Sequence, residues 1–252
     1  WGHVSGVRVN LATGTSSDHD VFTSIENLLG SDKAADHLTG DATANHIRGA
    51  RGNDTLIGAG GNDSLYGGYG NDSLYGGAGD DYLRDSAGHD YFSGGGGSDT
   101  LSYWGHLIGM TVNLETGANS GGDTYNSIEN ILGSNFANDD LTGDRGANTL
   151  NGAGGDDTLA GGHGNDLLIG GAGADVFVFH DATGQDTIAD FHGATQGDQI
   201  DLTGLTDIGD FDTLRTHLVA AGDDTLLHLG GTDHILLRNV DLLTLSEADF
   251  LF

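Results

Sequence analysis

The chain has 252 residues, of which 38 are acidic and only 8 are basic, so its formal net charge is −30. This charge excludes the basic surface that nucleic-acid binding requires, disfavours anionic membranes, and makes cations the expected partners. The chain has no cysteine and no proline. It has no apolar run long enough to span a bilayer, and its first residues lack the pattern of a secretory signal peptide.

Residues 1–48 align without a gap on residues 104–151, and about half of the aligned pairs are identical. For example, Ser24–Asn27 reads Ser-Ile-Glu-Asn, as does Ser127–Asn130. We therefore predict two related lead-in segments, 1–30 and 104–133, each placed ahead of an array of short repeats. The second copy follows array residues, whereas the first starts abruptly at Trp1, and we expect the chain to be the C-terminal piece of a longer protein.

Residues 31–103 form a first array with a period of nine residues, as in Gly67–Tyr75, which reads Gly-Gly-Tyr-Gly-Asn-Asp-Ser-Leu-Tyr. The eighth place of each repeat is apolar, and the sixth place is acidic with one exception. The sixth places are Asp36, Asn45, Asp54, Asp63, Asp72, Asp81, Asp90 and Asp99, and the eighth places are Leu38, Ile47, Leu56, Leu65, Leu74, Leu83, Phe92 and Leu101. Such a fixed period with one apolar column predicts a solenoid.

A second array, residues 134–178, continues the same pattern. Its sixth places are Asp139, Asn148, Asp157, Asp166 and Asp175, and its eighth places are Leu141, Leu150, Leu159, Leu168 and Phe177. In both arrays the last three places of a repeat form a short strand whose middle side chain points inward, because side chains alternate across a strand. Two repeats, or eighteen residues, then complete one coil of a parallel β-roll.

Residues 179–252 differ in composition, because glycine thins out and apolar residues rise. Leu214, Leu218 and Val219 have helical spacing within 212–221. Residues 225–229 and 234–240 are predicted to be two strands joined by a hairpin turn at Gly230–Asp233. These elements are expected to form a cap on the open last coil. The whole chain is thus predicted to be all-β, with two tandem arrays in a parallel β-roll (a calcium-binding β-solenoid) and a C-terminal mixed β cap that contains a short helix.

The repeat indicates a calcium site for physical reasons. The glycines of a Gly-Gly-x-Gly-x-Asp turn can adopt positive φ and let backbone carbonyls crowd toward one point, which the Asp carboxylate closes. Hard oxygen ligands without sulfur suit calcium better than zinc or copper. Two carboxylates about 5 Å apart repel each other by roughly 3 kcal/mol at an effective dielectric constant of about 20, so stacked turns need a cation.

Because a coil takes eighteen residues, carboxylates that share an ion come from alternate repeats. We expect several calcium ions, held in four groups. The predicted ligands are Asp54, Asp72 and Asp90 on one edge, Asp63, Asp81 and Asp99 on the other, and in the second array Asp157 and Asp175 on one edge with Asp166 on the opposite edge. Weak or empty sites are expected at Asn45 and Asn148 and at the Asp90 repeat, which lacks the leading glycines. Asp36 and Asp139 are weaker candidates.

The nonapeptides resemble those of the RTX (repeats-in-toxin) family, whose members leave bacteria by type I secretion. Residues 1–30 resemble the lead-in coils found ahead of such arrays, and 179–252 resemble the family's C-terminal cap. The resemblance implies that Asp186 continues the acidic column on the Asp166 edge, with Asp190 as a weaker addition. The ending Ser246–Phe252, an acid followed by three large apolar residues, resembles a type I export signal.

The leading hypothesis is therefore a non-enzymatic module that binds calcium and serves the secretion and extracellular folding of whatever lies upstream. Its expected partners are calcium and the type I secretion apparatus, and its expected location is outside the bacterium or on its surface. Two alternatives stay open. One is a self-associating adhesin or surface-layer stalk, and the other is an accessory module of a secreted hydrolase, protease or polysaccharide epimerase.

The outward tyrosines and the twelve histidines are further candidate functional groups. Tyr66, Tyr75, Tyr82 and Tyr91 flank the inward column and must face outward, where they either shield the edges of a thin roll or stack on sugars. No His-Glu-x-x-His pair and no Gly-x-Ser-x-Gly sequence occurs, so the sequence predicts neither a zinc hydrolase nor a serine hydrolase site. No catalytic residue is assigned.

Overall fold

The structure is a computed structural model that describes residues 6–84, 86–180 and 184–252. It divides into two compact units: unit 1 comprises residues 1–104 and 117–130, and unit 2 comprises residues 105–116 and 131–252. Residues 117–130, which the sequence groups with the second lead-in segment, thus belong to unit 1. The segment boundaries derived from the sequence stay predictions. Trp1, where the first copy of the long repeat starts, and Asp85, which opens the irregular repeat, lie outside the described residues.

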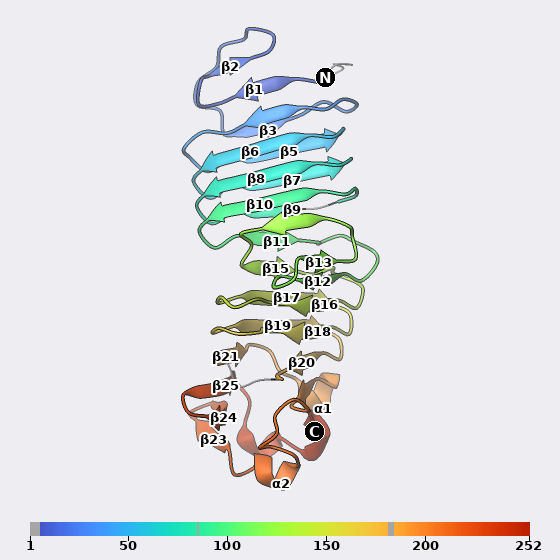
Figure 1. The fold of residues 1–252 in the computed structure, drawn as a ribbon, viewed down its shortest axis with the longest axis vertical. Coiled ribbons are helices and arrows are strands. Elements are labelled where there is room, and N and C mark those ends of the chain that lie inside the picture. Colours follow the sequence, from blue (N-terminus) through green and yellow to red (C-terminus); the bar gives the residue numbers. More distant parts are fainter. Residues whose placement is uncertain (1–5, 85, 181–183) are drawn as a thin grey trace. The chain divides into compact units, whose positions relative to one another are not determined.

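Unit 1 consists of short strands (Figure 1). They are β1 (Arg8–Asn10), β2 (Thr15–Ser16), β3 (Asn27–Leu29), β4 (His37–Thr39), β5 (His46–Arg51), β6 (Thr55–Gly60), β7 (Ser64–Tyr69), β8 (Ser73–Ala78), β9 (Tyr82–Arg84), β10 (Tyr91–Gly96), β11 (Thr100–Ser102), β13 (Ala118–Asn119) and β14 (Thr124–Asn126). Successive array strands go to two different sheets. One sheet has the order β14-β10-β8-β6-β4-β1-β2, and the other contains β11-β9-β7-β5-β3.

The pairing is parallel and in register with the sequence period. Leu56 pairs with Leu74 in one sheet, and Leu65 pairs with Leu83 in the other, so each strand meets the strand two repeats later. This is the eighteen-residue coil of a parallel β-roll. The hairpin of β1 and β2, at the start of unit 1, is antiparallel instead.

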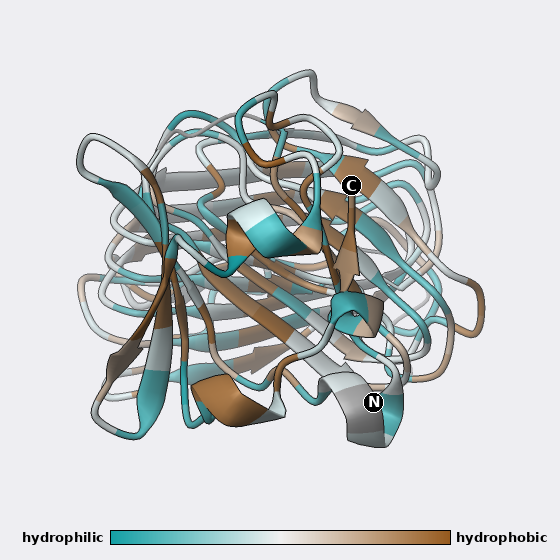
Figure 2. Ribbon diagram, turned by 90° about the horizontal axis from the view of Figure 1, so that it is seen from below, coloured by the Kyte–Doolittle hydropathy of each residue, from teal (hydrophilic) through white to brown (hydrophobic). Residues whose placement is uncertain are grey.

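The core of each unit is the eighth-place column. Leu56, Leu65, Leu74 and Phe92 are fully buried, as are Leu141, Leu150 and Phe177 in unit 2. Figure 2 shows that the apolar segments lie mainly on strands, whereas many turns are hydrophilic. Because each short strand contributes little more than one inward apolar side chain, the core between the two sheets is narrow, and the edges of the roll must contribute to stability.

Unit 2 continues the same architecture and ends in a cap. Its array strands and those that follow in register are β12 (Thr111–Asn113), β15 (Asn130–Leu132, whose first residue belongs to unit 1), β16 (Asp140–Thr142), β17 (Thr149–Gly154), β18 (Thr158–Ala160), β19 (Leu167–Ala172), β20 (Val176–Val178), β21 (Gln185–Ile188) and β22 (Gln199–Asp201). One sheet contains β12-β16-β18-β20-β22-β26, and the other contains β15-β17-β19-β21-β25-β24-β23.

The cap completes both sheets of unit 2. Its elements are α1 (Gly193–Gln196), α2 (Phe211–Leu214), β23 (Leu218–Ala221), β24 (Asp224–Gly230), β25 (Asp233–Leu237), the 3-10 turns η1 (Leu242–Thr244) and η2 (Glu247–Asp249), and β26 (Phe250–Leu251). Strand β25 pairs in parallel with β21, and β26 pairs in parallel with β22. The predicted hairpin at Gly230–Asp233 is confirmed, because β24 and β25 are antiparallel.

The prediction of a helix within 212–221 is wrong for most of that segment. Only the first turn is helical, capped by Asp210, whose carboxylate accepts from the N–H of Thr213 at 2.7 Å. Leu218 instead lies in β23 and pairs with Leu227 of β24. Leu214 and Leu218 are both buried. Their four-residue spacing thus reflects a turn followed by an edge strand that gains backbone hydrogen bonds from the hairpin.

Candidate metal-binding edges

The sixth-place side chains form hydrogen-bonded columns along the edges of the roll. The Oδ1 atom of Asp72 accepts from the backbone N–H of Asp54, eighteen residues earlier, at 2.8 Å. The Oδ1 atom of Asp81 accepts in the same way from Asp63, also at 2.8 Å. We name four columns by one member each. The Asp54 column contains Asp36, Asp54, Asp72 and Asp90, the Asp63 column Asn45, Asp63, Asp81 and Asp99, the Asp157 column Asp139, Asp157 and Asp175, and the Asp166 column Asn148, Asp166 and Asp186.

The second oxygen of these carboxylates is buried and lacks a donor. All predicted ligand aspartates of the columns are at most 5% exposed. Within the described part of the chain, the Oδ2 atom makes no hydrogen bond in Asp54, Asp63, Asp81, Asp99, Asp157, Asp166 and Asp175. A buried charged acceptor without a partner is costly, because it has lost its water and gained nothing in exchange. These oxygens are therefore positioned for a cation.

Glycine at the first place of most repeats keeps an oxygen-lined gap open. If Gly76 carried a Cβ atom, the carbonyl oxygen of Gly94 would lie only 2.6 Å from it, and Asp81 Oδ2 would lie closer still. Gly58 has the same surroundings, formed by Asp63 Oδ2 and the carbonyl oxygen of Gly76. Two acceptors from adjacent coils thus converge where no donor stands between them. A cation is the group that such a pair can accommodate.

The fourth-place glycine brings a further carbonyl to each edge. Gly70 has a φ of +134°, a conformation that favours glycine. A Cβ atom on Gly70 would strike the carbonyl oxygen of Gly52 in the turn one coil earlier, and Gly79 stands in the same relation to Gly61. The turns therefore stack closely enough for their carbonyl oxygens to reach the neighbouring turn, as the glycine pattern predicts.

Burial raises the pKa values of carboxyl groups in the columns. Loss of solvent raises the pKa of Asp157 and Asp166 to about 7, with the neighbouring carboxylates in each column adding to the rise. Burial likewise raises the pKa to about 6 in Asp54, Asp63, Asp175 and Asp186. The pKa values of Asp81, Asp99 and Asp139 are raised for the same reason. Without a cation, the charged form of these groups is thus disfavoured in the folded chain.

The candidates that were expected to be weaker have different surroundings. Asp36 accepts from the N–H of Val7 through Oδ1 and from the N–H of Ser31 through Oδ2, at 2.7 and 2.5 Å. Asp139 accepts from the N–H groups of Met110 and Ser134, both at 2.6 Å. Both oxygens of each carboxylate are therefore engaged by backbone donors. Their role as ligands stays a prediction.

The family resemblance implied Asp190 as a weaker addition to the Asp166 column, but Asp190 does not continue that column. Its two carboxylate oxygens accept from the N–H groups of Gly170 and Gly171, at 3.0 and 2.9 Å. Those glycines open the repeat of Asp175, so Asp190 lies beside the opposite edge. Asp186 does continue the Asp166 column, because its Oδ1 atom accepts from the N–H of Asp166 at 2.9 Å.

Asparagine takes the acidic place in the repeats that contain Asn45 and Asn148. Their Oδ1 atoms accept from the N–H groups of Asp41 and Asp144, both at 2.8 Å. Their own N–H groups donate to Asp63 and Asp166, so the columns are maintained without a charge at these positions. Asp90 is buried and continues the Asp54 column although its repeat lacks the leading glycines.

Three acidic residues that the nine-residue period missed extend the columns. Asp123 Oδ1 accepts from the N–H of Asp90 at 2.9 Å, Glu129 Oε2 from that of Asp99 at 2.9 Å, and Asp198 Oδ1 from that of Asp175 at 3.1 Å. They lie 33, 30 and 23 residues beyond their donors rather than eighteen. Asp123 and Glu129 belong to the second lead-in segment. The only sequence signal that marked this segment was its alignment with residues 1–30.

The residues present fit calcium, which prefers six to eight oxygen ligands. Among residues 6–84, 86–180 and 184–252, no three carboxylate or imidazole side chains gather into a metal cluster. An ion at these edges would therefore be held by carboxylates of successive turns together with backbone carbonyls of the glycine-rich turns. Bound calcium would neutralise the stacked charges and join adjacent coils.

A parallel β-roll whose edges carry stacked carboxylates and carbonyls defines a class, the acidic solenoids that hold hard cations between their turns. A family model, the RTX calcium-binding nonapeptide repeat, matches the chain in four copies, at residues 32–65, 66–101, 135–167 and 142–177. The chain thus carries RTX calcium-binding nonapeptide repeats over residues 32–101 and 135–177.

Comparison with whole proteins adds the following. No curated protein sequence matches the chain. Among solved structures, one similar chain is the extracellular lipase LipA from Serratia marcescens, with 19% sequence identity and a TM-score of 0.35. The match covers 86% of this chain and 40% of that one, so the chain spans about two fifths of the length of the lipase. None of the helices in the described residues has the length and apolar character needed to cross a membrane.

Proposed function

We propose that this chain is the calcium-dependent folding and secretion module of an extracellular bacterial RTX protein. It stays unfolded where calcium is scarce, leaves the cell with its C-terminus first, and folds outside where calcium is plentiful. The proposed ligands are the carboxylates of Asp54, Asp63, Asp72, Asp81, Asp90, Asp99, Asp157, Asp166, Asp175 and Asp186. The module itself has no catalytic role in this proposal.

The observation that carries the proposal is the set of buried Oδ2 atoms without donors. A fold that leaves such atoms unpaired in coil after coil has a high free energy when no cation is bound. Calcium binds the folded roll and not the extended chain, so its binding free energy becomes folding free energy. The roll is therefore suited to act as a sensor of extracellular calcium.

The position of the C-terminal tail supports export before folding. The last strand, β26, pairs with β22, where Phe250 lies opposite Ile200. Phe250 and Asp249 are each 4% exposed. Ser246–Ala248 and Phe252 remain exposed, so folding of unit 2 covers only part of a signal in this tail. An export apparatus that reads Asp249 and Phe250 must therefore meet them on the unfolded chain.

The experiment is an export assay in a strain that carries a type I secretion system. Deletion of residues 241–252 should abolish appearance of the chain in the medium. Leu202→Ala serves as the matched control, because Leu202 is fully buried near the same tail and its loss weakens the fold without touching the signal. We expect normal export of this variant, and normal export of the deletion variant would contradict the proposal.

A further inference from the structure

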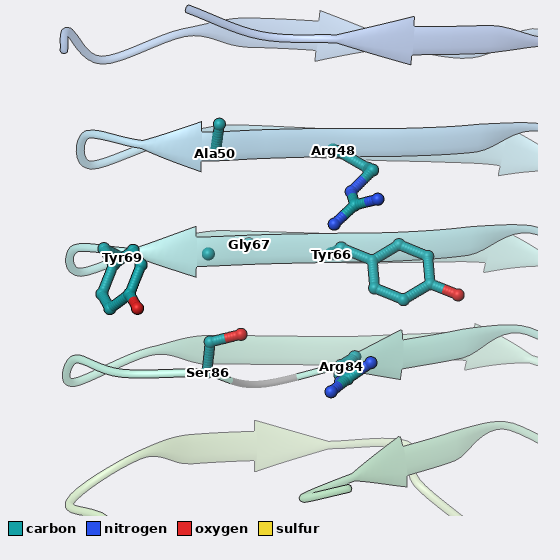
Figure 3. Close-up of a pocket in the computed structure, with 8 residues that line it drawn as sticks. Arg48, Ala50, Tyr66, Gly67, Tyr69, Arg84 and Ser86 are labelled. Carbon is teal, nitrogen blue, oxygen red and sulfur yellow. The ribbon is translucent and has the colours of Figure 1, made fainter. Parts of the chain in front are cut away.

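Unit 1 has a hollow on the outer face of one sheet, beside the turns that carry the Asp54 column. Its volume is about 210 Å³, and its principal side chains are Arg48, Tyr66, Tyr69, Arg84 and Ser86. Arg48 pairs with Tyr66 across β5 and β7, and Tyr66 pairs with Arg84 across β7 and β9. Figure 3 shows these three residues on three successive strands, with Tyr69 and Ser86 at the other end of the hollow.

Arg48 and Arg84 line the hollow, and Arg51 lies on the same strand as Arg48, so positive charge gathers here in a strongly acidic chain. Arg48, Arg51 and Arg84 are three of only 8 basic residues, against a net charge of −30. Within the described part of the chain, none of the three forms an ion pair with a carboxylate. All three lie on one sheet, at strands β5 and β9, so an isolated cationic patch stands on one outer face.

Packing among the aromatic residues explains part of this arrangement. The Arg48 guanidinium lies 5.4 Å from the ring centre of Tyr66, and that of Arg51 lies 5.5 Å from the ring centre of Tyr69. The rings of Tyr66 and Tyr82 are 6.0 Å apart. Such cation–π and ring contacts stabilise a sheet surface, but they do not satisfy N–H donors.

Arg84 is the residue that packing leaves unexplained. Its Nε atom is buried and has no hydrogen-bond partner in the described structure. A buried donor of a charged group is costly when it is unpaired, and a guanidinium is satisfied best by a planar oxyanion that accepts two parallel hydrogen bonds. Arg84 therefore indicates a ligand with a carboxylate or a similar group.

The tyrosines specify the rest of the ligand. Tyr69 is 63% exposed, and Tyr66 is half-buried beside Arg48. An exposed aromatic ring offers a flat apolar face with a hydroxyl at its end, which suits a sugar ring. A long nucleic acid, with a charge on every phosphate, is disfavoured by the acidic surroundings, whereas a short acidic oligosaccharide brings only a few carboxylates to the hollow.

We propose that this hollow binds an acidic oligosaccharide, with sugar carboxylates on Arg48 and Arg84 and a sugar ring against the face of Tyr66 or Tyr69. The two arginines lie two strands apart, about 10 Å at the usual strand spacing, so they engage different sugars of one chain. This binding is additional to the proposed folding function and requires only that unit 1 be folded.

The test is isothermal titration calorimetry on the full chain in saturating calcium, with an oligosaccharide of galacturonic acid as the probe. The comparison ligands are the same oligosaccharide with its carboxyl groups reduced to alcohols, inorganic phosphate, and a short glutamate peptide. Because uronates also bind calcium, the variant Arg48→Gln/Arg84→Gln is compared with Arg145→Gln/Arg238→Gln. The latter removes two exposed arginines of unit 2 and gives the same net charge. Circular dichroism in calcium verifies that each variant is folded.

We expect the uronate to bind and the Arg48→Gln/Arg84→Gln variant to lose affinity about ten-fold or more, whereas the control variant retains it. Tyr66→Ala should weaken binding and Tyr66→Phe should not, because the ring face makes the contact. Absence of uronate binding, or equal losses in the two double variants, would overturn the proposal. Equal affinity for the reduced sugar, for phosphate or for the glutamate peptide would overturn it as well, because recognition would not be of an acidic sugar.

Discussion

The backbone N–H of Asp99 donates to Oε2 of Glu129 at 2.9 Å, although the two residues are 30 positions apart and only one belongs to an array. Glu129 thus takes the place that the next repeat aspartate would occupy in the Asp63 column. The equivalent residue of the first lead-in segment, Glu26, is exposed. The neighbouring isoleucines differ in the same sense, because Ile128 is only 4% exposed whereas its equivalent Ile25 is 40% exposed. The same sequence therefore closes an acidic column only where an array precedes it.

This relationship predicts unequal effects of one substitution at two equivalent positions. Glu129→Ala leaves the N–H of Asp99, a fully buried residue, without an acceptor. We expect it to lower the free energy of unfolding in calcium by about 1 to 3 kcal/mol. Glu26→Ala is the control and should change it by less than about 0.5 kcal/mol. Urea unfolding followed by circular dichroism measures both, and equal effects would contradict the role of Glu129.

Neutralising one carboxylate within a column should have opposite effects with and without calcium. Asp63→Asn retains an oxygen that can accept from the N–H of Asn45 but removes a buried charge. In chelator the variant should show at least as much β structure as the parent chain, because repulsion falls. In calcium it should need about ten-fold more metal to fold.

Calcium titrations followed by circular dichroism test this prediction, with Asp18→Asn, at an exposed position, as the control. The account is wrong if Asp63→Asn folds at the same calcium concentration as the parent chain.

A pair of glycine substitutions tests the oxygen-lined gap. A Cβ at Gly76 would strike Asp81 Oδ2 and the carbonyl oxygen of Gly94, whereas a Cβ at Gly96 would meet nothing within 4 Å. Gly76→Ala should therefore cost about 1 to 3 kcal/mol of stability in calcium, as overpacking does, and weaken calcium binding. Gly96→Ala should be nearly neutral. Thermal unfolding of the calcium-loaded variants measures the difference. Similar unfolding midpoints for the two variants would contradict the claim that the first-place glycine keeps this gap open.

The raised pKa values predict how stability depends on pH. In the folded chain without metal, the pKa values of Asp157 and Asp166 are about 7, against an ordinary value of 3.8. The folded state therefore binds more protons than the unfolded state between about pH 4 and pH 7. Stability of the metal-free roll is present at low pH and is lost as pH rises through this window.

Calcium affinity should change in the opposite direction, rising between pH 6 and 8, because the metal competes with protons for the same carboxylates. Urea midpoints of the metal-free chain at several pH values, and calcium titrations at the same values, measure the two trends. A metal-free roll that becomes more stable as pH rises would show that these carboxylates are not buried as described.

The repeat was sufficient to predict the fold of both arrays. Leu74 is fully buried in the strand where the eighth place puts it, and the Oδ1 atom of Asp72 binds the N–H of Asp54, eighteen residues earlier. This follows because one short strand and one turn per nine residues leave little conformational choice. The nine-residue period thus determined the core and the grouping of the sixth places, while their occupation by calcium stays a prediction.

What the sequence could not predict lies where the period stops. Asp123 and Glu129 join the columns through an irregular segment, so no spacing rule pointed to them. Asp190 follows the array closely yet accepts from the N–H groups of Gly170 and Gly171, because strand β21 carries the chain from the edge of Asp186 to the opposite edge. Leu218 has helical spacing from Leu214 but lies in a strand, since pairing with β24 outweighs local propensity.

The most direct test of the central claim is far-ultraviolet circular dichroism of the purified chain, first in chelator and then during titration with calcium, with magnesium as the control ion. The account predicts a disordered spectrum in chelator and a cooperative change to β structure with calcium but not with magnesium. A β spectrum that chelator leaves unchanged would show that the buried carboxylates need no cation, and would contradict calcium-dependent folding.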